Sequence, residues 1–156
     1  MTMTFGQSIK HVFGNYATFQ GRASRSEFWW WYLFTSIVSF IVILPALPWY
    51  VDFLNQLGSA SSQGGQPGDA LMALPPVTGL ASLALVLSVA WSLAILIPTI
   101  AVAARRLHDS NKSGWFLLLW FVSCCFGIGA IILIIMWILP STPGPNRYGE
   151  SAAQGA

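Results

Sequence analysis

The sequence predicts an all-α integral membrane protein with three transmembrane helices preceded by a short amphipathic interfacial helix. The 156-residue chain is 55% hydrophobic and only 8% charged, whereas a soluble domain usually carries about 25% charged residues. The apolar residues are gathered into three blocks, each near the ~20 residues that an α-helix needs to cross a bilayer. None of these blocks carries the polar stripe expected of a helix buried in a soluble protein.

Residues 4–19 are expected to form the amphipathic interfacial helix. The apolar residues from Phe5 to Tyr16 follow helical spacing, and Thr4 and Gln7 fit a capping box at its start. Such a helix lies either on the inner face of the membrane or against the cytoplasmic end of the helix bundle. The two positions share one sequence signature, and the interfacial position is preferred.

The first transmembrane helix is expected over residues 27–51. Between Glu27 and Asp52 lie 24 uncharged residues, and Ser24 with Glu27 has the spacing of a capping box. A secretory signal usually has an apolar region of only about 7–15 residues. The sequence therefore predicts an anchor that stays in the membrane.

Residues 52–78 are expected to form a flexible external loop. Gly, Ser and Gln dominate residues 55–70, a composition that buries too little apolar surface to order itself. The second transmembrane helix is expected over residues 79–104, where Pro98 predicts a kink.

The last three segments are a charged cytoplasmic hairpin at 105–114, a third transmembrane helix at 115–139 and a turn-rich tail at 140–156. Small residues, including Gly127 and Gly129, lie near the middle of the third block. The block could break there and return as a re-entrant hairpin. A continuous span with a small-residue packing face is favoured.

The distribution of basic residues predicts the orientation. Six Lys and Arg residues lie before the first span or between the second and third, and residues 52–78 have none. By the positive-inside rule the N-terminus and the 105–114 hairpin are cytoplasmic, and the 52–78 loop is outside. Three complete spans would place the tail outside.

Three motifs resemble a known family: "GRASRSEFWWW" at 21–31, "RRLHDSNKSGW" at 105–115 and "PGPNRYG" at 143–149. With the spacing of the apolar blocks, the chain is similar to the bacterial membrane proteins of domain-of-unknown-function family 805. The resemblance implies an inner-membrane, multi-pass protein. It implies no established activity, so it transfers no functional residues.

The charged residues of the first two motifs form the candidate site. We expect Glu27 to pair with Arg105 or Arg106, and Asp109 with Arg22 or Arg25, if the helix ends are neighbours. The cluster would then serve either as structural ion pairs or as a cationic surface for anionic lipid headgroups or a membrane partner. Its members are Arg22, Arg25, Glu27, Arg105, Arg106, His108 and Asp109.

An enzyme is not expected. Neighbouring residues on a helix point about 100° apart, so His108 and Asp109 would not form an acid–base pair. The two histidines have no metal-ligand spacing, and Cys124 and Cys125 lie in an apolar block. No catalytic, cofactor or metal site and no nucleic-acid partner are predicted.

The predicted function is a non-catalytic inner-membrane protein that presents a charged Arg, Glu, His and Asp surface to anionic lipid or a membrane partner. The alternative is a subunit of a small-solute or ion transporter or channel formed by oligomerisation. Three helices cannot enclose a pathway alone, and the spans hold no ionisable residue at depth. The sequence does not identify a substrate, a partner or an oligomeric state.

Overall fold

The computed structural model describes residues 3–62, 68, 76–77, 79–120 and 127–151. Within these residues all regular secondary structure is helical, apart from one isolated bridge between Asn146 and Gly149. The chain divides into two compact units. We call Met1–Ser36 with Ile95–Ala156 the terminal unit and Ile37–Ala94 the central unit, and describe each by itself.

Two helices of the described chain are long and apolar enough to cross a membrane, namely Arg25–Ser59 and Gly79–Asp109. The second is helix α5, whose 31 residues correspond to about 46 Å at 1.5 Å per residue. The third apolar helix, α7 (Ile128–Ile138), is shorter. An all-helical protein with long apolar helices is therefore confirmed, whereas the described residues of the third predicted span hold no helix of that length.

Helix α2 (Arg25–Ile43) enters the central unit at Ile37 and continues there through the 3-10 turn η1 (Leu44–Ala46) into α3 (Leu47–Ser62). The prediction of a loop from residue 52 onward is wrong for residues 52–62, which are helical. Extending an existing helix fixes one residue per added hydrogen bond, so α3 needs no new nucleus. The hydroxyls of Ser59 and Ser62 also bind carbonyls three residues earlier, at 2.9 and 2.8 Å.

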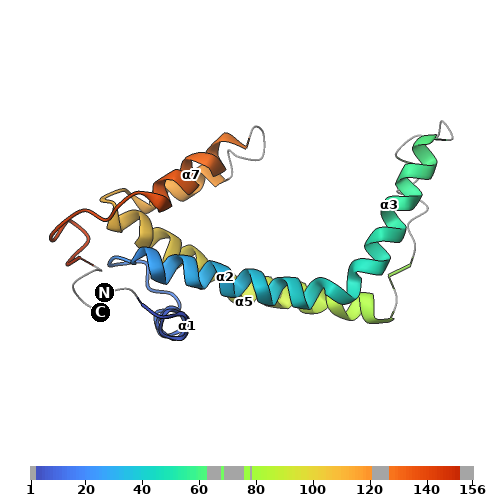
Figure 1. Ribbon diagram of the computed structural model, residues 1–156, viewed down its shortest axis with the longest axis horizontal. Helices are drawn as coiled ribbons and strands as arrows, with labels where there is room; N and C mark the ends of the chain where they lie inside the picture. Colours follow the sequence, from blue (N-terminus) through green and yellow to red (C-terminus); the bar gives the residue numbers. More distant parts are fainter. Residues whose placement is uncertain (1–2, 63–67, 69–75, 78, 121–126, 152–156) are drawn as a thin grey trace. The chain divides into compact units, whose positions relative to one another are not determined.

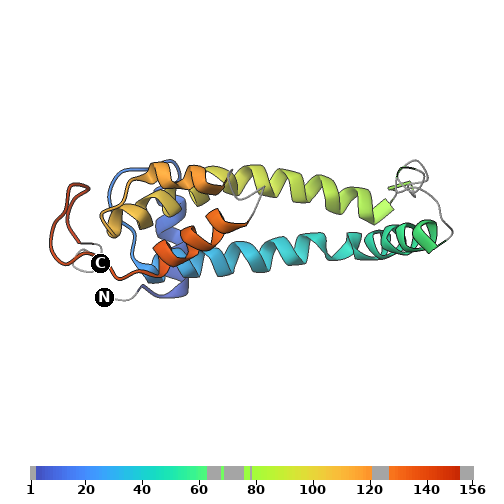
Figure 2. The ribbon, with the colours of Figure 1, turned by 90° about the horizontal axis from the view of Figure 1, so that it is seen from above.

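The later half of α2 and the first half of α5 run beside each other in the central unit (Figure 2). The Trp91 indole N–H donates to the Ser39 hydroxyl at 3.0 Å and so joins the two helices. Ser39 and Ser88 also line a groove of about 340 Å³ between them.

The terminal unit contains a core of aromatic and small side chains. Phe28 and Trp31 of α2 pack with Val12, Val102 and Ala103 in one buried cluster. Small residues on α5 leave room for the large rings of α2, so these two helices can approach closely. This core positions the beginning of α2 beside the end of α5.

Helix α1 (Phe5–Gly14) packs against α2 within the terminal unit. Phe5 contacts Trp30 and Phe13 contacts Trp31, with ring centroids 5.6 and 5.1 Å apart. The predicted capping box is present, and the Thr4 backbone N–H donates to the Gln7 side chain at 3.0 Å. This packing against α2 agrees with the second of the two positions that the sequence leaves open, a helix packed against the bundle.

The single helix predicted over residues 115–139 is wrong for the described residues. Residues Gly114–Leu118 form the 3-10 helix η2, and Gly127 adopts the left-handed conformation at φ 67° before α7 begins. A left-handed residue ends a right-handed helix, and glycine adopts it without a Cβ clash. Residues 121–126, with Ser123, Cys124 and Cys125, lie outside the described residues.

Candidate functional site

The end of α5 brings most of the predicted cluster into one buried network. Helix α5 continues to Asp109, so the charged motif is largely helical, and only residues 110–113 form the predicted hairpin turn. The residues of the network are at most 8% exposed: Arg22, Glu27, Arg105, Arg106 and Asp109.

Asp109 is the centre of the first ion-pair group. Its carboxylate accepts from Arg22 Nε at 2.9 Å and from the Arg106 guanidinium, which lies three residues earlier on the same helix face. The Ser141 hydroxyl also donates to it. Two arginines therefore share one carboxylate that is 0% exposed, an arrangement that requires hydrogen bonds to the remaining donors.

Those remaining donors bind backbone carbonyls in the last turn of α7 and in the segment that follows it. Arg22 Nη2 donates to the Thr142 carbonyl and Arg22 Nη1 to the Gly144 carbonyl, both at 2.7 Å. Arg106 Nε donates to the Trp137 carbonyl at 2.9 Å, and its Nη2 donates to the Leu139 carbonyl. The last carbonyls of a helix have no partner inside it, so Arg106 acts as a cationic cap for α7.

Glu27 is the centre of the second group. One carboxylate oxygen, Oε1, lies 3.0 Å from Arg105 Nη1 and 3.0 Å from His11 Nδ1. The side chains of Glu27 and Arg105 are 2% and 4% exposed, whereas that of His11 is 42% exposed. Ser24 caps the Glu27 backbone N–H at 3.2 Å, so only the serine half of the predicted second capping box forms, while the carboxylate binds Arg105.

His108 belongs to a third contact and not to the ion pairs. Its Nδ1 lies 3.3 Å from the Gly21 carbonyl, and its ring stacks on Tyr148 with centroids 3.8 Å apart and planes 5° apart. Asn146 donates to the His108 carbonyl at 2.9 Å. His108 and Asp109 thus face different partners.

The structure selects among the pairings that the sequence left open. Glu27 pairs with Arg105 and not Arg106, and Asp109 pairs with Arg22 and not Arg25. Arg25 is exposed and belongs to none of the ion pairs that the described residues form.

Several partners of the network could not be identified from the sequence. The sequence predicts His11 only as part of an amphipathic helix, and it predicts the segment after α7 only as a turn-rich tail. The motif "PGPNRYG" supplies Asn146 and Tyr148, although its sequence alone predicts no role for them. No group of three His, Cys, Asp or Glu residues in the described chain could hold a metal ion.

Comparisons with known proteins cover this site and most of the chain. The family described as "Protein of unknown function (DUF805)" matches residues 16–150. The Inner membrane protein YhaI of Escherichia coli (strain K12) is 32% identical over 145 residues, 93% of this chain and 94% of the relative. The Inner membrane protein YhaH of the same strain is 29% identical over 138 residues, 88% of this chain and 89% of the relative. No solved structure matches.

Proposed function

The chain belongs to the DUF805 family of proteins of unknown function, and we propose that it is a non-catalytic inner-membrane protein whose cytoplasmic surface binds anionic lipid headgroups. Two relatives are named inner membrane proteins. The single observation that carries the lipid proposal is an exposed cation, Arg25, at the start of a row of exposed aromatic side chains.

The exposed cations Lys10 and Arg25 differ from the buried arginines in whether a carboxylate of the described chain pairs with them. Glu27 and Asp109 are buried and bind arginines of the network. Lys10 and Arg25 are exposed, and neither belongs to an ion pair of the described residues. Their charge is therefore available to an anion from outside the chain.

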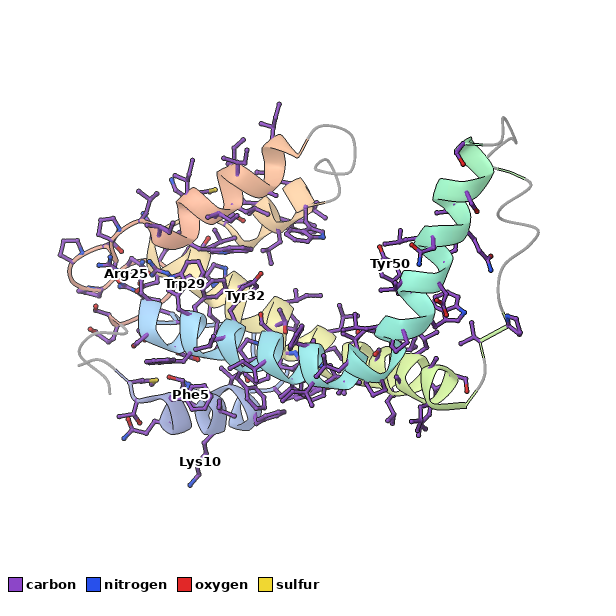
Figure 3. All side chains as sticks on the ribbon, turned by 45° about the vertical axis from the view of Figure 1, so that its right-hand side comes forward. Phe5, Lys10, Arg25, Trp29, Tyr32 and Tyr50 are labelled. Atoms are coloured by element: carbon purple, nitrogen blue, oxygen red, sulfur yellow. The ribbon has the colours of Figure 1, made fainter. Side chains whose placement is uncertain are left out.

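Aromatic residues accompany Arg25 on α2, whereas Lys10 belongs to α1. Trp29 and Tyr32 follow Arg25 at four and seven residues, and are 38% and 54% exposed. All three succeed one another along α2, and Lys10 points outward from α1 (Figure 3). Aromatic rings are enriched at the headgroup level of a bilayer, and basic residues beside them attract anionic lipids.

The same geometry supports the cytoplasmic orientation. Anionic lipid gives the cytoplasmic leaflet a negative surface potential, and basic residues are retained on that side. We therefore place Lys10, Arg25 and the end of α5 at the cytoplasmic surface.

Tryptophan quenching tests this function. The full chain is reconstituted into phosphatidylcholine vesicles that contain brominated phosphatidylglycerol or brominated phosphatidylcholine. Preferential quenching by the anionic lipid is expected. Lys10→Gln and Arg25→Gln should each lower the preference about fivefold, because a basic residue near an anionic surface contributes about 1 kcal/mol.

Arg25→Lys is the matched control, since it keeps the charge and should keep most of the preference. An equal preference in the native chain and in the double variant would reject lipid binding at these residues. A membrane protein that co-purifies with the native chain and not with that variant would instead assign the surface to a partner.

A further inference from the structure

The apolar segment 114–139 begins beside the end of α5. After Asp109 the backbone turns, and the Lys112 N–H donates to the Leu107 carbonyl at 2.9 Å. Gly114 lies so close to α5 that a Cβ there would be 3.4 Å from the Ala104 side chain. Residue 114 is thus at the level of the last two turns of α5.

The segment also ends beside the end of α5. The carbonyls of Trp137 and Leu139 accept hydrogen bonds from Arg106. The Thr142 N–H donates to the Asp109 carbonyl at 3.0 Å. Residue 139 is therefore at the same level of α5 as residue 114, and all of these residues belong to the terminal unit.

A continuous helix cannot satisfy both sets of contacts. Twenty-five residues of α-helix from Gly114 would place Leu139 about 37 Å away. Helix α7 has 11 residues and is about 16 Å long, roughly half of the ~30 Å hydrocarbon core. Gly127, left-handed at φ 67°, ends any helix that precedes α7.

We propose that η2 and α7 are the two ends of a re-entrant membrane segment, which enters and leaves the bilayer on the side where α5 ends. The exposed apolar side chains of this segment would contact the hydrocarbon tails of one leaflet. Trp115 and Trp120 are 78% and 59% exposed, and apolar side chains line the open faces of α7. Exposed isoleucines there are Ile128, Ile131, Ile132, Ile134, Ile135 and Ile138.

Arg106 has a specific part in this arrangement. The backbone at the end of α7 needs donors, because groups without partners near hydrocarbon are costly. Arg106 supplies these donors, and Asp109 compensates its charge. The tail after residue 139 is consequently on the same side as the turn at 110–113, whichever side of the membrane that is.

Cysteine labelling tests the proposal in the full chain. Cys124 and Cys125 are first replaced by alanine, and single cysteines are introduced as Lys112→Cys, Glu150→Cys and Gly65→Cys. A membrane-impermeant maleimide is applied to intact and to permeabilised cells. Glu150→Cys should react like Lys112→Cys and opposite to Gly65→Cys, which is in the segment between the two long helices.

Labelling of Glu150→Cys together with Gly65→Cys would overturn the proposal and restore a complete third span. The second measurement keeps both native cysteines. A C-terminal alkaline phosphatase fusion should be inactive and a C-terminal fluorescent protein should be bright if the turn at 110–113 is cytoplasmic. An active phosphatase fusion, together with a cysteine at position 112 that does not react with the maleimide in intact cells, would likewise reject the re-entrant segment. Neither result depends on lipid binding by Lys10 or Arg25.

Discussion

The pair of Glu27 and Arg105 allows a quantitative test of the buried network. In Glu27→Gln the carboxylate is lost while Arg105 keeps its charge. Arg105 has no second anion among the described residues, and its Nε and Nη2 atoms are buried without a hydrogen-bond partner. Glu27 is therefore the group that compensates this buried cation.

The expected loss follows from the burial of the pair. Breaking a buried ion pair by removing one partner costs about 3–5 kcal/mol. The two side chains are 2% and 4% exposed, so water should reduce this cost only slightly. We therefore expect Glu27→Gln to lower the free energy of unfolding by about 3 kcal/mol. The double variant Glu27→Gln/Arg105→Gln removes both charges. Its loss should be about 1–3 kcal/mol smaller than the sum of the single losses.

Unfolding in mixed micelles with increasing dodecyl sulfate measures these free energies. Arg106→Gln is the matched control, because Arg106 is equally buried but pairs with Asp109. The losses of unfolding free energy caused by Arg106→Gln and by Glu27→Gln should be additive within about 0.5 kcal/mol. His11→Gln should cost less than about 1 kcal/mol because the His11 side chain is 42% exposed. Additive losses for Glu27 and Arg105 would refute the pairing.

Two further predictions concern the hydrogen bonds of Arg22 and of Trp91. Arg22→Lys should fail to replace Arg22, because one ammonium cannot bind both the Asp109 carboxylate and the Thr142 and Gly144 carbonyls. The rate of amide hydrogen exchange in residues 140–149 should rise in this variant. An unchanged rate would contradict the conclusion that Arg22 holds this segment. Trp91→Phe and Ser39→Ala remove the same bond, so each should cost about 1 kcal/mol. Their combination should cost less than the sum in the same unfolding assay, whereas full additivity would argue that the bond is absent.

The sequence predicts the helices whose pattern depends on local chemistry. The capping box at Thr4, the cap at Ser24 and the long apolar helix that begins at Gly79 are all present. Each of these features depends on residues within one helix, so neighbouring sequence contains the necessary information. The predicted helix over 4–19 is shorter in the structure and ends at Gly14.

The third apolar block shows the limit of hydropathy. Its length fits a complete span, and length was the basis of the prediction. The proposed re-entrant path rests instead on where the two ends of the block are attached. The attachment of its second end depends on hydrogen bonds from Arg106 to carbonyls 31 and 33 residues later. Backbone carbonyls have no sequence signature, so this partner could not be identified. Gly127 is the available signal in the sequence, but a small residue is equally typical of a helix-packing face.

The sequence predicts which charged residues belong to the site more accurately than it predicts which of them pair with each other. The pairing of Glu27 with an arginine of α5 followed from two helix ends on one side of the membrane. The choice between Arg105 and Arg106 depends on which helix face meets α2. Neighbouring side chains on a helix point about 100° apart. Arg105 therefore reaches Glu27, and Arg106 reaches the end of α7.

The buried position of most of these charges changes what they can do. Arg22 and Arg106 direct their donors to Asp109 and to backbone carbonyls, so they have little capacity for an external anion. Lys10 and Arg25 are exposed and have no such partners in the described chain. Stability and lipid binding should therefore be separable. Substitutions in the buried set should lower the free energy of unfolding, and substitutions at Lys10 and Arg25 should lower lipid preference while leaving that free energy nearly unchanged.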